Sequence, residues 1–223
     1  RGWKGESRYF LLNDLRHHKQ RYPMMVQRYV ALAFERNAVP SANEMPILAP
    51  KLTVNPQQQA ATLKQFEKQT ALLGTRPLIG FCPGAEFGPA KRWPHYHYAK
   101  LAEMLIEQGY AIMLFGSAKD VDVGEQIRNT LPEALQPFCV NLAGQTSLDQ
   151  AVDLIAHCAA IVSNDSGLMH IAAATSRPLV ALYGPTSPTY TPPLSDKAII
   201  LRKIEGGLLK VRKSTDSAEG YHQ

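Results

Sequence analysis

The 223-residue sequence lacks several features that would place it in a specialised class of protein. No apolar run approaches the roughly 18 residues that cross a bilayer, and no basic-then-apolar signal segment follows Arg1. It contains no internal repeat and no low-complexity tract. Its three cysteines, Cys82, Cys139 and Cys158, stand far apart without a CxxC pair, which argues against a disulfide framework and against a zinc site. These absences, with a hydrophobic fraction of 45%, predict a globular protein of a reducing compartment.

The sequence has no large excess of positive or negative charge, and it lacks the familiar nucleotide-binding motifs. Lys and Arg number 24 against 19 Asp and Glu, and this net charge of +5 is dispersed. It fits an anionic small ligand or surface, but no basic stripe recommends nucleic acid. The fingerprint GxGxxG is absent, and GAEFGPAK has the wrong glycine spacing for a Walker loop, with Arg92 instead of Ser or Thr after Lys91. A nicotinamide enzyme is therefore disfavoured.

The first 74 residues lack the regular alternation of predicted strands and helices that the rest of the chain shows. Apolar spacing and proline positions predict a helix over 23–36, a proline-rich linker over 38–54, and a second helix over 56–73 capped by Asn55. No complete domain can be assembled from these pieces. We expect residues 1–74 to be the end of a preceding domain plus a connection, and residues 75–223 to form a domain of their own.

From Thr75 onward, predicted strands and helices alternate. The strands are expected at 77–82, 111–115, 138–141, 161–162, 179–183 and 198–201. The helices are expected at 94–108 and 120–130, from Ser147 onward, and after Gly167. This alternation predicts an α/β fold with a doubly wound, parallel, Rossmann-like sheet. The segment from Glu205 onward shows little periodicity and is expected to be solvated.

Topology then indicates where a ligand binds. If the six strands take the common order 3-2-1-4-5-6, a crevice opens between the carboxyl ends of the first and fourth strands. The loop after the first strand is CPGAEFGPAKRWP, and the loop after the fourth is NDSGLMH. The second loop puts an acid, a hydroxyl and a glycine at a helix N-terminus, which favours anions. Simple capping by Asp165 or Ser166 explains this turn at least as well by itself, but its place opposite the first loop favours a binding site.

The two loops supply the candidate ligand-binding residues. Gly84 and Gly88 allow a ligand to approach the backbone closely. Lys91, at the lip of the sheet with Arg92, is a candidate partner for phosphate. Asp165, Ser166 and His170 are expected to project from the opposite loop.

Three further patterns are open to two interpretations. Asp120 follows the second strand, where an acid often meets a ribose hydroxyl, but Asp120-Val121-Asp122 is also explained by helix capping. Thr146 lies in the Gly144–Ser147 stretch, which resembles a turn plus a cap at another strand's carboxyl end. His95 and His97 are two apart in a helix and do not share a face, which disfavours a common metal ion.

Five long motifs carry a family resemblance. They are CPGAEFGPAKRWP, LFGSAKD, NLAGQTSLDQA, NDSGLMHIAAA and LYGPTSPTYTPP, and they occur in this order along the chain. Together with RGWKGESRYFLLNDLR at the start, they resemble the lipopolysaccharide heptosyltransferases of glycosyltransferase family 9. The resemblance covers nearly the whole chain, and several long motifs in the right order make it specific.

The resemblance implies a GT-B enzyme with two Rossmann-like domains, of which the C-terminal one holds the sugar nucleotide. It implies transfer of L-glycero-D-manno-heptose from ADP-heptose to an inner-core heptose on Kdo-lipid A, with inversion and without a metal or other cofactor. It also implies a cytoplasmic enzyme, with contact at the inner membrane's cytoplasmic face as a further expectation. The family's general base, an aspartate early in the N-terminal domain, is expected to lie outside this chain, because Asp14 sits in a different motif. The 223 residues are therefore expected to bind ADP or ADP-heptose without transferring heptose.

The resemblance also assigns roles to residues. Lys91 of the KxWP signature is expected to contact the donor phosphates and to stabilise the leaving diphosphate, and Asp120 is expected to meet the ribose. The rest of the implied donor site consists of Gly84, Ala85, Thr146, Asp165, Ser166, Gly167 and His170. Two alternatives remain: another GT-B enzyme such as an epimerase or a different glycosyltransferase, and a donor-binding module without turnover. Arg1, Lys4 and Arg8 fit either the acceptor's phosphates or ordinary solvated charges.

Overall fold

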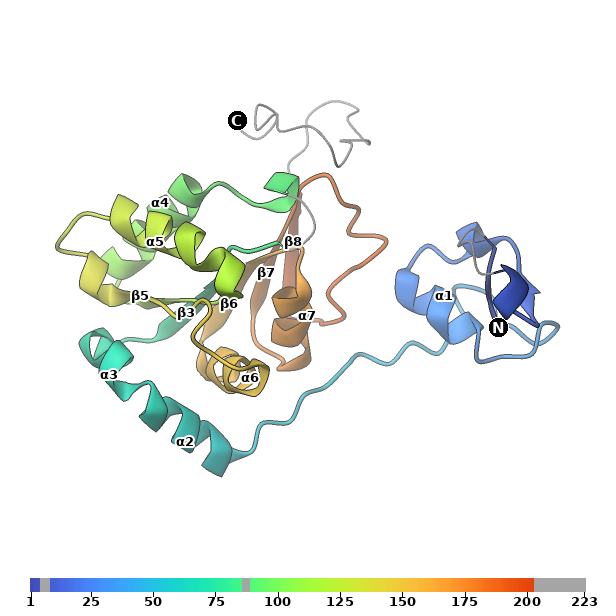
Figure 1. The fold of residues 1–223 in the computed structure, drawn as a ribbon, viewed down its shortest axis with the longest axis horizontal. Helices are drawn as coiled ribbons and strands as arrows, with labels where there is room; N and C mark the ends of the chain where they lie inside the picture. The colour runs from blue at the N-terminus through green and yellow to red at the C-terminus, as the bar shows by residue number, and fades with distance from the viewer. Residues whose placement is uncertain (5–8, 86–88, 203–223) are drawn as a thin grey trace. The chain divides into compact units, whose positions relative to one another are not determined.

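The computed structural model describes residues 1–4, 9–85 and 89–202, and it divides into two compact units (Figure 1). Among the described residues, the first unit consists of those within 1–49 and 187–192, and the second consists of those within 50–186 and 193–202. The sequence prediction instead divides the chain between residues 74 and 75. Residues 50–74 lie in the second unit because they pack there, as described below. The assignment of residues 1–74 to the end of an acceptor domain and its linker stays a prediction.

The first unit is small and contains little regular structure. Its elements are β1 (Gly2–Trp3), η1 (Tyr9–Leu11), β2 (Leu15–Arg16), η2 (Lys19–Arg21) and α1 (Met25–Ala31). Strands β1 and β2 pair in parallel. Tyr22, Ala31 and Met45 form its buried core, with Val39 and Ile47 packed against them. The stretch from Val39 to Ile47 therefore belongs to this unit, and the linker predicted over 38–54 is wrong for that part.

Helix α1 is shorter than the predicted helix over 23–36. Buried Arg16 donates hydrogen bonds to the carbonyls of Ala31 and Phe34, and Arg1 donates to the carbonyls of the same turn. These carbonyls would otherwise accept the N–H groups of a continuing helix. Two guanidinium groups thus end α1 at Ala31, a contact between distant residues that helical spacing does not reveal.

The second unit contains a six-stranded sheet that is parallel throughout. Its strands are β3 (Leu78–Cys82), β4 (Ala111–Leu114), β5 (Cys139–Asn141), β6 (Ala160–Asn164), β7 (Leu179–Tyr183) and β8 (Ala198–Arg202). The strand order is β5-β4-β3-β6-β7-β8. This is the predicted order 3-2-1-4-5-6, so both the fold class and the switch point between the first and fourth strands are confirmed.

Helices cover both faces of this sheet (Figure 1). The larger ones after β3 are α4 (His95–Glu107), α5 (Val121–Thr130), α6 (Leu148–His157) and α7 (Gly167–Ala174), and the short ones are η4 (Pro89–Lys91), η5 (Ala118–Asp120) and η6 (Gln136–Phe138). Side chains alternate along β3: Phe81 packs with α4 and α5, whereas Cys82 packs with α6 and α7. This is the period-2 pattern of a strand buried on both faces. No helix in the described part of the chain is long and apolar enough to span a membrane.

Residues 56–73 form α2 (Pro56–Gln65), α3 (Glu67–Thr70) and η3 (Ala71–Leu73) instead of one helix. The Asn55 side chain accepts hydrogen bonds from the N–H groups of Gln57 and Gln58, which confirms the predicted cap. The break falls at Phe66, whose ring is buried in the same core as α6 and α7. Thr62 Oγ1 donates to Asp153 Oδ2 of α6 at 2.7 Å, and both residues are buried. Helix α2 is thus attached to the sheet domain by packing and by a buried hydrogen bond.

All three cysteines are free and buried. Burial raises the pKa of the Cys82 and Cys139 thiols to about 12, and it raises the pKa of Cys158 further. A thiol with such a pKa carries almost no thiolate at neutral pH, so these cysteines act as small apolar core residues.

Candidate functional site

A cavity of about 400 Å³ opens at the carboxyl ends of β3, β4 and β6. This is the position at which the predicted strand order puts a ligand-binding crevice. Its lining residues are Gly84, Ala85, Gly116, Ser117, Asp120, Thr146, Ser147, Leu148, Ala151, Ser166, Gly167, Leu168 and Ile171. Six of the predicted site residues are in this set: Gly84, Ala85, Asp120, Thr146, Ser166 and Gly167. The walls combine small residues and apolar side chains with a few polar groups, as in a typical small-molecule site.

A larger cavity, of about 580 Å³, lies near the other edge of the sheet, where β3 begins. Helices α2 and α3, the start of β3 and the end of α6 supply its lining. None of the predicted site residues lies there. The smaller cavity is therefore the candidate site.

The other three predicted residues lie beside the smaller cavity. Lys91 Nζ forms an ion pair with Asp165 Oδ2 at 2.8 Å, and Asp165 directly precedes Ser166 in the cavity wall. Asp165 is buried, whereas the Lys91 side chain is 24% exposed. The charges of both affect His170 on α7. The structure thus brings the β3–α4 loop and the β6–α7 turn together through this ion pair.

The N-terminus of α7 is not capped by a side chain. Ser166 occupies the N-cap position but its hydroxyl makes no capping hydrogen bond, and the Asp165 carboxylate is directed at Lys91. A Cβ atom added at Gly167 would meet no atom within 4 Å. The capping interpretation of this turn is therefore wrong. The first-turn N–H groups remain available to an anion, with an ammonium group nearby.

The two carboxylate oxygens of Asp120 differ in their interactions: Oδ2 accepts two short hydrogen bonds, whereas Oδ1 makes a longer ionic contact. Its Oδ2 accepts hydrogen bonds from Ser117 N at 2.9 Å and from Ser117 Oγ at 2.8 Å, in a capping box that opens η5. Its Oδ1 lies 3.5 Å from the Arg92 guanidinium. Asp120 therefore takes part in the capping box of η5, but its side chain does not cap α5, the helix that the capping alternative had in view. It still presents an acceptor to the cavity.

Close packing around Asp120 explains why Gly84 has no side chain. A Cβ atom at Gly84 would come within 2.6 Å of the Asp120 carboxylate, so even a methyl group would displace it. Gly84 thus makes room for the acid of the neighbouring loop. Gly88, the other glycine predicted to allow close approach, lies outside the described residues.

His170 is partly buried on α7, and this burial lowers the pKa of its imidazole. The neighbouring Lys91 charge also lowers that pKa, whereas the Asp165 charge raises it. A neutral imidazole can both donate and accept a hydrogen bond, so His170 can contact a polar ligand group without a positive charge.

The lowered His170 pKa predicts a pH-dependent stability. The unfolded chain binds the imidazole proton more tightly than the folded chain does, so stability should fall as the pH drops below about 6.5. His170→Gln should remove this part of the pH dependence. Urea unfolding at several pH values between 5 and 7.5 measures how the free energy of unfolding depends on pH. If this dependence is the same in His170→Gln as in the wild-type chain, His170 is not its cause.

The Gly144–Ser147 stretch forms a turn followed by a cap, as predicted. Gly144 adopts a φ of 71°, and the Ser147 side chain caps α6 by accepting from Gln150 N at 3.3 Å. Thr146 nevertheless lines the cavity as well.

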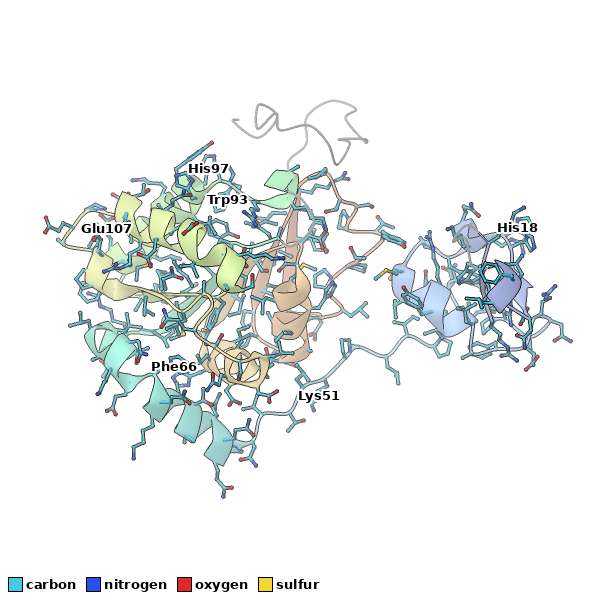
Figure 2. The ribbon with its side chains drawn as sticks, viewed as in Figure 1. His18, Lys51, Phe66, Trp93, His97 and Glu107 are labelled. Atoms are coloured by element: carbon cyan, nitrogen blue, oxygen red, sulfur yellow. The ribbon has the colours of Figure 1, made fainter. Side chains whose placement is uncertain are left out.

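The sequence disfavoured a metal ion at His95 and His97 and a catalytic role for Asp14, and the structure describes the surroundings of these residues. In the described parts of the chain, no group of three or more His, Cys, Asp or Glu side chains could hold a metal ion. Figure 2 shows His97 beside Trp93, and their rings stack with centroids 5.3 Å apart. Arg16 and Arg36 hold the pKa of Asp14 far below its usual value. Such a carboxylate is a poor proton acceptor.

Of the basic residues considered for binding acceptor phosphates, Arg1 can be examined in the structure and Arg8 cannot. Arg1 is occupied by backbone carbonyls and by the carboxylates of Asp14 and Glu35. Arg8 lies outside the described residues. Arg1 therefore fits a structural role better than phosphate binding.

The sequence analysis did not predict the polar or small lining residues Gly116, Ser117, Ser147 and Ala151, nor the buried Asn164 that precedes Asp165. Ser117 and Gly116 line the cavity, and their place directly after a predicted strand was a usable signal. Asn164 was missed because the neighbouring Asp165 and Ser166 dominate the motif. Its hydrogen bonds, described below, join residues that are far apart in sequence.

Comparison with known proteins identifies the class to which this fold and site belong. The family model for glycosyltransferase family 9 (heptosyltransferase) matches residues 1–222. The chain therefore belongs to glycosyltransferase family 9.

Individual relatives narrow the resemblance to one kind of heptosyltransferase. The chain is 75% identical over 223 residues to lipooligosaccharide heptosyltransferase 2 of Haemophilus influenzae, and 58% identical over 225 residues to lipopolysaccharide heptosyltransferase 2 of Escherichia coli. In both comparisons the whole chain is matched, and it spans 64% and 63% of the two relatives. The solved structure of E. coli ADP-heptose lps heptosyltransferase II matches with a TM-score of 0.83 at 57% identity, over 92% of this chain and 62% of that protein.

Proposed function

We propose that this chain is the nucleotide-sugar-binding part of a heptosyltransferase II. The whole enzyme would transfer L-glycero-D-manno-heptose from ADP-heptose to an inner-core heptose of lipopolysaccharide. The observation that carries the proposal is the cavity at the switch point, where Lys91 lies opposite the uncapped N-terminus of α7. The similarity to heptosyltransferases 2 along the whole chain supports this substrate class.

The proposed chemistry follows from these groups. When an acceptor hydroxyl attacks the anomeric carbon of an ADP-sugar and loses its proton to a general base, the bond from that carbon to the β-phosphate oxygen breaks, and ADP leaves with additional negative charge on its diphosphate. The Lys91 ammonium group and the N–H groups of the α7 N-terminus would stabilise that charge without a metal ion. Asp120 Oδ1 would accept a hydrogen bond from a ribose hydroxyl, and Ser166, Gly167 and His170 would line the pyrophosphate and the heptose. We propose a Kdo-lipid A acceptor and a place in the cytoplasm, beside the inner membrane, on the family resemblance alone.

The base of the nucleotide separates this proposal from another GT-B enzyme. Calorimetric titration of the chain with ADP and with UDP measures the preference directly. We expect ADP to bind more tightly. A preference for UDP would contradict the heptosyltransferase assignment and would favour a different sugar-nucleotide enzyme. A donor-binding module without turnover would share the ADP preference, and an assay of heptose transfer by the whole protein distinguishes it.

Gly167→Ala tests the helix N-terminus as an anion site without disturbing the fold. The added methyl group meets no protein atom within 4 Å, and alanine suits a helix better than glycine. We expect an unchanged or slightly higher melting temperature, together with roughly tenfold weaker ADP binding, because the methyl group would occupy the space in front of the first-turn N–H groups. Undiminished ADP affinity would show that the diphosphate lies elsewhere.

A further inference from the structure

Asn164, the last residue of β6, is fully buried although its side chain is polar. Its Nδ2 donates a hydrogen bond to the Pro83 carbonyl at 2.7 Å. Its Oδ1 accepts hydrogen bonds from the Trp93 backbone N–H at 3.2 Å and from the Tyr98 hydroxyl at 3.1 Å. A buried amide needs such partners, but here all three partners belong to one neighbouring segment of the chain.

The two backbone partners of Asn164 lie at opposite ends of the loop between β3 and α4. Pro83 directly follows β3, and Trp93 lies two residues before α4. The loop between them carries Lys91. A single side chain therefore fastens both ends of the loop that supplies the site's ammonium group.

The contacts of Asn164 and of the next residue form two adjacent links to this loop. Asn164 Oδ1 accepts from the Trp93 N–H, and Asp165 Oδ2 accepts from Lys91 Nζ at 2.8 Å. Lysine has a long and flexible side chain. A fixed backbone two residues away restricts where its Nζ can reach, in addition to the ion pair itself.

We propose that Asn164 is a positioning residue for Lys91. It holds the β3–α4 loop so that Lys91 Nζ faces the N-terminus of α7, and it does this without touching the nucleotide. The link to nucleotide binding rests on the proposed function, whereas the fastening of the loop does not. The chain thus contains a residue that controls diphosphate binding from inside the core.

The test compares the wild-type chain with Asn164→Ser, whose shorter side chain cannot reach both ends of the loop. Two quantities are measured: the hydrogen-exchange rate of the Trp93 amide without ligand, by NMR, and the calorimetric affinities for ADP and for adenosine. We expect at least tenfold faster exchange at Trp93 and about tenfold weaker ADP binding, the loss typical of one hydrogen bond. Adenosine lacks the diphosphate, so its affinity should change less than about twofold.

Asn141→Ser is the matched control. Asn141 is also a buried amide at the end of a strand of this sheet, and its side chain bonds to the Val121 carbonyl, the Glu125 carboxylate and the Ala143 N–H instead of the β3–α4 loop. Its replacement should lower the melting temperature without changing Trp93 exchange or the ratio of ADP to adenosine affinity. Asn164→Asp is a second variant in case Asn164→Ser does not fold. It keeps the acceptor for Trp93 but loses the donor to Pro83, and it should shift ADP affinity in the same direction.

Two results would overturn the proposal. Unchanged Trp93 exchange in Asn164→Ser would show that the side chain does not fasten the loop. Faster exchange with equal losses for ADP and adenosine would show a structural role without positioning of Lys91. In a Lys91→Met background, Asn164→Ser should cause no further loss of ADP affinity, because it acts through Lys91. A wild-type chain that does not bind ADP would overturn the proposed function, and Trp93 exchange would still decide whether Asn164 fastens the loop.

Discussion

Replacing Lys91 with methionine is expected to weaken ADP binding by about 10- to 100-fold, the range typical of a lost charge-assisted hydrogen bond. Methionine keeps the length and the apolar stem of lysine but removes the ammonium group. Lys91 Nζ pairs with Asp165, which directly precedes the uncapped N-cap residue of α7, so its charge lies close to that helix N-terminus. Calorimetric titration with ADP measures the loss. Lys100→Met is the matched control, because Lys100 is exposed on α4, where it pairs with Glu103.

A second variant separates direct from indirect effects of Lys91. If Lys91 served only to neutralise Asp165, then Lys91→Met would have no effect in a chain that already carries Asp165→Asn. If Lys91 contacts the phosphates, the loss should persist in that background. ADP affinity that is independent of Lys91 in both backgrounds would contradict the proposed donor site.

Thr62→Val is expected to lower the free energy of unfolding by about 2–3 kcal/mol, because it leaves a buried carboxylate without its hydroxyl donor. Valine has nearly the shape of threonine, so packing changes little. The hydroxyl lost is the one that donates to Asp153 Oδ2, and Asp153 is only 3% exposed. Urea denaturation of the full chain measures the change.

Thr62→Ser is the control for this prediction, because it keeps the hydroxyl and should retain most of the stability. The double variant Thr62→Val/Asp153→Ala should cost less than the sum of its two single variants, since neither partner is then left unpaired. Additive losses would show that the two side chains do not depend on each other. They would also weaken the argument that this bond attaches α2 to the sheet domain.

The sheet could be predicted because its signals are local and repeated. Each strand is a short apolar run, each helix has a regular stripe, and α4 ends at Glu107, one residue before its predicted end. The strand order then follows from a common topology, which the structure adopts. Six of the thirteen residues that line the cavity could be predicted for the same reason, since parallel strands bring their carboxyl ends to one edge.

The features that could not be predicted depend on contacts between distant residues. The early end of α1 is set by arginines that precede it by many residues, and the break at Phe66 is set by burial of its ring. The role of Asn164 is equally hidden, because its partners lie 66 to 81 residues away. The sequence pattern indicates where polar residues gather, but it does not show which of them bind one another.

The three buried cysteines can report local unfolding of this protein, because each thiol reacts only when the structure around it opens. Cys82 ends β3, Cys139 begins β5, and Cys158 follows α6, so the thiols sample three places in the sheet domain. A thiol-specific reagent cannot reach them in the closed molecule, and it modifies each one only while the surrounding structure is open. The rate of alkylation at each position, read by mass spectrometry, would therefore show whether the domain opens as a whole or strand by strand, without any introduced label.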